Sequence, residues 1–265
     1  MLRFILWNEG EIMNKDIGLI LNGWPYNSNE VTVRKIVGLD GRDKIQMRLD
    51  LGVLQMELDG RPDGERPKGH ESLLEWQESR RERHSARHGE DNGEDNRFAL
   101  SDEDCSDLKQ EAMQYYYRYL SLFHLGDYDL VIRDTERNLR AFDFIRENAE
   151  EDSDRFSLEQ FRPYVLMMNT RAQACLQLED NEFTLALDLI DDGIERIEEF
   201  LREVGREDLV ESCREINFLE EWKERIRNNR PLSLEEKLRD ELRLAVESEN
   251  YERAAQLRDQ IKEIA

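Results

Sequence analysis

The stretch TRAQACLQLEDNEFTLALDLIDDGIERI, Thr170–Ile197, decides the fold. Its first part ends near Leu178, and a polar turn follows. Its second part carries one apolar stripe at helical spacing: Phe183, Ala186, Leu187, Ile190, Ile194 and Ile197. Two amphipathic segments joined by a short polar turn predict an α-helical hairpin.

The same scheme occurs upstream. Ser101 is a suitable N-cap before Asp102, and an apolar stripe follows at helical steps: Tyr116, Tyr119, Leu120 and Phe123. Gly126 then ends this helix, and the next begins in LGDYDLVIRDTERNL. The sequence therefore predicts a second hairpin within a helical body over residues 101–230.

Both hairpins resemble tetratricopeptide-type repeats. Gly126, Asp127 and Tyr128 match the turn of the first unit, although Val131 replaces a small residue, and the second unit fits better through Ala174, Phe183, Ala186 and Gly193. Tyr128 and Phe183 lie 55 residues apart, whereas the repeat is about 34 residues long. The resemblance is degenerate. Two units need covering helices, and Ile216, Leu219 and Trp222 indicate one.

Residues 1–62 predict a small antiparallel β-region. Its apolar residues alternate with polar ones in two runs, Val31, Val33 and Val37, then Ile45, Met47, Leu49 and Leu51. Beyond Gly52 the apolar residues change phase, which favours a bulge or break there. The segment Ile17–Asn22 is a candidate for another strand. Trp24 and Tyr26 are expected to form an aromatic lid over the core, and a surface ligand site is the alternative.

Composition limits the function classes. The 265 residues include 38 Lys and Arg against 61 Asp and Glu, a formal net charge of −23. The electrostatic field of so negative a chain repels nucleic-acid backbones, so broad binding of duplex DNA is not expected. Three well-separated cysteines, with no CxxC motif, favour a reduced, cytoplasmic protein, and no apolar run approaches membrane-spanning length. Met13 is a second candidate for the initiator besides Met1.

Residues 63–100 predict a hinge helix and an acidic linker. Its basic run supplies the best local candidates for phosphate contact: Arg80, Arg81, Arg83 and Arg87. His84 and His88 have the i,i+4 spacing of a metal pair, but no third ligand accompanies them, so we predict no metal site.

Residues 231–265 predict a closing helical hairpin. Ser233 and Glu236 form a capping box, and Asn250 suits a left-handed turn between two short helices. Each helix carries one apolar stripe: Leu234, Leu238, Leu242 and Ala245, then Ala254, Leu257, Ile261 and Ile264. Helices of about fourteen residues are marginal alone, so we expect their apolar surface to be completed by a partner.

This hairpin resembles the UvrB/UvrC motif. The matching residues, which are also our candidate partner-binding residues, are Leu238, Leu242, Ala245, Tyr251, Glu252, Ala254, Ala255, Leu257, Arg258, Asp259 and Ile261. The resemblance implies a bacterial protein and a contact between helical hairpins, homotypic or heterotypic. In excision repair such motifs join the damage-recognition helicase subunit to its nuclease partner, and similar motifs occur in adaptors and ATPases of regulated proteolysis.

We therefore expect an α+β fold, mainly α, and a non-catalytic adaptor that needs no cofactor. It would bind a partner carrying a helical hairpin, or a second copy of itself. The alternative is an accessory factor of nucleotide excision repair that contacts DNA or repair proteins. A third hypothesis, an enzyme around Trp24 and Tyr26, has no phosphate loop, nucleophile–base set or metal cluster to support it.

Overall fold

The computed structural model describes residues 16–88, 97–231, 234–248 and 250–264. The choice between Met1 and Met13 and the cap at Ser233 fall outside these residues. Within them the chain is mainly helical, with one small antiparallel sheet near the N-terminus, so the expected α+β class is confirmed. No helix in this part of the chain is long and apolar enough to cross a membrane.

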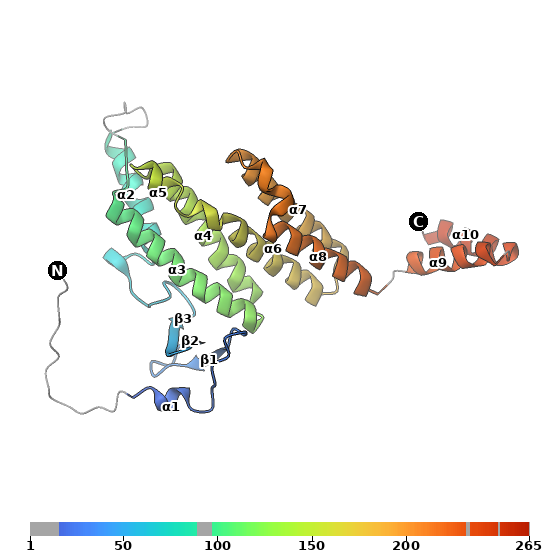
Figure 1. Cartoon of the computed structure of the whole chain (residues 1–265), viewed down its shortest axis with the longest axis horizontal. Helices are drawn as coiled ribbons and strands as arrows, with labels where there is room; N and C mark the ends of the chain where they lie inside the picture. The colour runs from blue at the N-terminus through green and yellow to red at the C-terminus, as the bar shows by residue number, and fades with distance from the viewer. Residues whose placement is uncertain (1–15, 89–96, 232–233, 249, 265) are drawn as a thin grey trace.

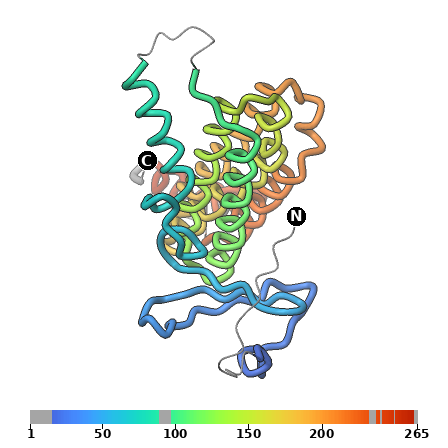
Figure 2. The backbone as a smooth tube through the Cα atoms, turned by 90° about the vertical axis from the view of Figure 1, so that its left-hand side faces the viewer, coloured from blue at the N-terminus to red at the C-terminus, as the bar shows by residue number. Residues whose placement is uncertain are grey.

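Three antiparallel strands form the sheet: β1 (Val33–Val37), β2 (Asp43–Leu49) and β3 (Gly52–Glu57), in the order β1-β2-β3. Directly opposite residues share a face, so Val33, Met47 and Leu54 lie together. Ile45, Met47 and Met56 are buried in the same core as the helical body. The sheet lies at one end of the helices (Figure 2).

Of the two alternatives expected at Gly52, the strand break is confirmed and the bulge is wrong. Leu49 pairs directly with Gly52 across the turn Asp50–Leu51, so the change of phase comes from a tight hairpin, not from a bulge. The expectation of another strand at Ile17–Asn22 was wrong, because this segment forms the short helix α1 (Gly18–Leu21). Asp16 lies just before this helix, and its Oδ1 accepts a hydrogen bond from the Gly18 amide at 2.8 Å, which closes a local side-chain turn.

The aromatic residues beside α1 also differ from expectation. The Arg34 guanidinium stacks on the Trp24 ring, with its Cζ 3.9 Å from the ring centroid. Arg34 also donates to Gln46, which donates to Gln55, so this face of the sheet is a polar ladder. Trp24 therefore packs on the polar face and does not cover the apolar core.

The body consists of α2 and two long helical hairpins closed by α8 (Figure 1). The helices are α2 (Leu73–His88), α3 (Asp102–Leu125), α4 (Tyr128–Asn148), α5 (Asp152–Arg155), α6 (Arg162–Glu179), α7 (Phe183–Glu203) and α8 (Arg214–Asn229). Three short 3₁₀ segments accompany them: η1 (Pro67–Gly69) precedes α2, and η3 (Glu159–Phe161) and η4 (Glu207–Ser212) precede α6 and α8. Helix α3 packs on α4, α4 on α6, α6 on α7, and α8 on α6 and α7.

The helix ends follow from specific residues. Ser101 caps α3 in a reciprocal capping box with Asp104. Gly126 ends α3 with a φ of 79°, and Asn181 makes the α6–α7 turn with a φ of 62°. Gly193 lets α7 approach α6, because a Cβ at this position would lie 2.2 Å from Thr170 Oγ1.

A buried ion pair fastens the sheet to the body. Arg118 and Asp134 are each 1% exposed, and the guanidinium donates to both carboxylate oxygens, at 2.7 and 2.8 Å. The remaining Arg118 nitrogen donates to the carbonyls of Glu57, the last residue of β3, and of Gly60, in the loop that follows. This one side chain therefore connects α3, α4 and the loop that follows the sheet.

The closing hairpin comprises α9 (Leu234–Glu247) and α10 (Tyr251–Ile264), which lie beyond α8 (Figure 1). Its buried side chains form a cluster built from these two helices alone, apart from the body's core. Asn250 lies in the turn between the two helices. Its side-chain oxygen accepts a hydrogen bond from the Arg253 amide at 3.2 Å, so it serves as the N-cap of α10.

Candidate protein-docking surfaces

The apolar stripes of the closing hairpin face each other. Leu238, Ala245, Ala254 and Leu257 are at most 9% exposed, and Leu242 and Ile261 pack against them half-buried. Small residues at 245 and 254 allow the helices to approach closely. These six of the predicted partner-binding residues therefore build the hairpin's own core.

The other five predicted residues point outward: Tyr251, Glu252, Ala255, Arg258 and Asp259 are all exposed. Tyr251, at the turn, is 67% exposed. Sequence reasoning missed Leu244 and Val246, which are 57% and 51% exposed. Their signal was available, since both are apolar residues of α9 that lie off its buried stripe. The outer surface of the hairpin near its turn thus carries three large exposed apolar side chains.

A second apolar surface lies on the helical body. A hollow of about 520 Å³ is present here, within the range of roughly 300–1,000 Å³ that is usual for ligand pockets. It opens between α3 and α6. Its lining includes Met113 and the aromatic residues Tyr116, Tyr117, Phe161 and Tyr164, and we call it the aromatic groove. Met113 and Phe161 are nearly half exposed, so apolar surface is accessible from solvent.

The aromatic groove is held by contacts between three helices. The Tyr116 ring lies 6.1 Å from that of Tyr164, centroid to centroid. Burial, with a smaller contribution from neighbouring Tyr116, raises the pKa of Tyr164 to about 12. Arg171 of α6 lies between Phe123 of α3 and Phe218 of α8, at 4.3 and 4.7 Å from their centroids. These contacts fix the spacing of the helices that form the groove.

The candidate phosphate contacts on α2 divide into two pairs. Arg80 forms an ion pair with Asp104 at 2.9 Å, and Arg81 forms one with Glu147 at 3.4 Å. Arg83 and Arg87 are exposed and, together with His84, His88 and Phe98, line a hollow of about 230 Å³. The structure therefore commits the first two arginines to contacts with the body and leaves Arg83 and Arg87 at the surface.

The two histidines of α2 have their ring centroids 4.7 Å apart. Over the described ranges, no group of three or more His, Cys, Asp or Glu side chains is arranged to hold a metal ion.

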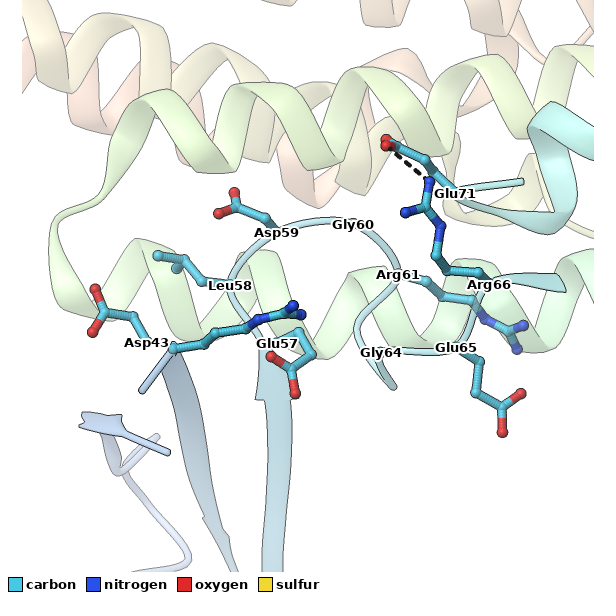
Figure 3. A pocket seen from close by; sticks show the side chains of 11 residues that line it. Asp43, Glu57, Leu58, Asp59, Gly60, Arg61, Gly64, Glu65, Arg66 and Glu71 are labelled. Atoms are coloured by element: carbon cyan, nitrogen blue, oxygen red, sulfur yellow. Dashed lines mark ion pairs between the residues drawn. The ribbon is translucent and has the colours of Figure 1, made fainter. Parts of the chain in front are cut away.

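A further hollow, of about 420 Å³, lies beside the loop that follows β3 (Figure 3). Its lining mixes charges of both signs, including Glu57, Asp59, Arg61 and Arg66. Arg66 forms an ion pair with Glu71 at its edge, at 3.5 Å. Arg61 lies 3.4 Å from the fully buried Glu111, so this surface is part of the charged network that joins sheet and body.

The three thiols lie in separate parts of the body. Cys105 is fully buried, and Cys175 and Cys213 are half-buried. Burial raises the pKa of all three, that of Cys105 to about 11. Each thiol is therefore protonated and poorly nucleophilic near neutral pH.

Comparison with known proteins identifies one similarity. The family model described as UvrB/uvrC motif matches residues 234–265, which span α9 and α10. No curated protein and no solved structure matches the chain. The closing hairpin thus carries a motif that is associated with protein–protein interaction and with DNA-repair proteins.

Proposed function

We propose that this chain is a non-catalytic adaptor whose closing hairpin docks a helical hairpin of a partner protein. One observation carries the proposal: the segment that matches the UvrB/uvrC motif is a hairpin with its own core and exposed apolar side chains near its turn. Tyr251 and Val246, each more than half exposed, supply apolar contact area that a partner can cover.

The aromatic groove is the second docking surface of this adaptor. It lies on the two-hairpin body, which we interpret as tetratricopeptide-like, and Tyr116, Tyr117 and Tyr164 combine apolar rings with hydroxyl groups. Tyrosine suits protein recognition because it adds large contact area and one hydrogen-bonding group at low entropic cost. An adaptor of this kind holds one protein on its body and another on its hairpin. We place it in the bacterial cytoplasm, where its three thiols stay reduced.

Affinity purification of two tagged chains tests the proposal. The full chain and a chain lacking residues 231–265 are expressed at matched levels, and co-purifying proteins are quantified by mass spectrometry. Because the hairpin core is separate from the body's core, the shortened chain keeps its fold, which circular dichroism checks. We expect at least one partner to be lost with the hairpin. Identical sets of partners from the two chains would contradict the proposal.

A second candidate function is an accessory factor of nucleotide excision repair that contacts DNA. Arg83 and Arg87, exposed beside His84 and His88, favour this candidate. It predicts a gel shift of duplex DNA that weakens as salt rises and that Arg83→Glu with Arg87→Glu abolishes. Binding that is unchanged by this double substitution, or absent at low salt, would count against it.

A further inference from the structure

The two open sides of the closing hairpin differ in charge. One side is marked by an ion pair across the helices, Arg253 to Glu241 at 2.9 Å. These residues lie one position before Ala254 and Leu242, which belong to the core between the two helices. We call the residues of that core the seam residues. Successive residues of an α-helix are rotated by about 100°, so the residues that follow the seam positions point to the opposite side of the hairpin.

That opposite side combines positive charge with apolar surface. Helical rotation places on it Arg239, Arg243 and Val246 from α9, and Tyr251, Ala255, Arg258 and Lys262 from α10. All seven side chains are exposed. We call this surface the basic face. It has four cationic residues and no acidic one among these seven positions, in a chain whose net charge is −23.

The local ion pairs of the basic face are weak. Arg258 pairs with the adjacent Asp259 at 3.1 Å, and both side chains are about 60% exposed. Arg239 and Arg243 also have interactions of their own. Pairs between exposed groups contribute little to stability, so a partner's carboxylates can replace them at small cost. The positive sign of the face, not unpaired groups, is what distinguishes it.

We propose that the basic face selects an acidic partner: an amphipathic helical segment with carboxylates around an apolar strip that covers Val246 and Tyr251. This inference rests on the proposed function and adds the chemistry of the partner. Charge complementarity carries it, because charge sign mainly decides which partners are accepted. A second copy is disfavoured as occupant through the same face, since a two-fold contact brings four cations against the same four.

A charge-swapped copy of the full chain serves as the probe. It carries Arg239→Glu, Arg243→Glu, Arg258→Glu and Lys262→Glu, which preserve the apolar residues of the face and change the net charge by −8, from −23 to −31. Labelled wild-type chain is titrated with this copy at low and at high salt, and association is followed by fluorescence anisotropy. Overall repulsion between two acidic chains opposes binding, so association reports the local face.

The control swaps the opposite side, with Lys237→Glu and Arg253→Glu. We expect wild type to bind the charge-swapped copy at least about tenfold more tightly than it binds wild type or the control copy, with the difference lost at high salt. A milder copy with Arg258→Glu and Lys262→Glu is expected to show a smaller gain, and circular dichroism confirms that each copy stays helical. Equal association of all copies would overturn the inference.

The outcome is separable from that of the proposed function. If partners are lost on deleting residues 231–265 but survive Arg258→Glu with Lys262→Glu, the acidic-partner inference fails and the docking role stands. If light scattering shows wild type forming a dimer that the same two substitutions disrupt, the occupant is a second copy, and the inference is likewise overturned.

Discussion

Substituting Asp134 by alanine should destabilise the body more than any surface substitution. The carboxylate accepts two hydrogen bonds from Arg118, at 2.7 and 2.8 Å, and a third from Arg133 Nε at 3.0 Å. Arg118 is 1% exposed, so its charge would remain buried with two backbone carbonyls as partners. Removing one partner of a buried pair costs about 3–5 kcal/mol. For a body of this size the melting temperature should fall by roughly 10 °C.

Urea unfolding followed by tryptophan fluorescence measures this effect. Trp76 and Trp222 lie in the body, and residues 234–265 contain no tryptophan, so the signal does not report the closing hairpin. The control is Glu198→Ala, which removes an exposed pair with Arg202 at 3.1 Å and should cost at most about 0.5 kcal/mol. If Asp134→Ala costs no more than this control, the assignment of the pair as the fastener between sheet and body is wrong.

Three further predictions concern the interior of the body. Gly193→Ala should cost about 1–3 kcal/mol, because its Cβ would overlap Thr170, and Thr170→Ala in the same chain should recover part of the loss in a urea titration. Burial raises the pKa of Tyr128 and Tyr164 to about 12, so these phenols stay neutral in the folded chain while the unfolded chain ionises them near pH 10. Stability should therefore be retained below about pH 10 and fall from there toward pH 12; tyrosinate absorbance that rises fully near pH 10 without unfolding would refute this. Cys105, with a pKa of about 11, should react with iodoacetamide at pH 8 far more slowly in the folded chain than in urea, as mass spectrometry of the labelled peptide would show.

The elements that could be predicted are those with a strong period. The stripe from Phe183 to Ile197 predicted α7, and Gly126 marked the α3–α4 turn, because helical spacing and a left-handed glycine act locally. The phase change at Gly52 was detected, and of the two explanations offered for it the strand break is confirmed and the bulge is wrong. A hairpin turn and a bulge both shift the apolar residues by one position, and only strand pairing distinguishes them.

What the sequence could not give is the pairing of side chains that are distant in the chain. Arg118 and Asp134 looked like two of many surface charges until the fold buried them together. In the closing hairpin, the apolar stripes that contain Leu238 and Leu257 were evident. Such a pattern does not tell whether the two helices bury their stripes against each other or against a partner protein. The helices cover each other there, which moves the candidate contact surface to Tyr251 and Val246.

Site-specific photo-crosslinking tests the central claim, that the outer surface of the closing hairpin contacts a partner protein, most directly. A benzophenone amino acid replaces Tyr251 in one full-length chain and Gln256, exposed and on the opposite side of α10, in another. After irradiation in cells, we predict a crosslinked protein from position 251 and little from position 256. Equal crosslinking from both positions, or none from 251 while a partner still co-purifies, would contradict the claim.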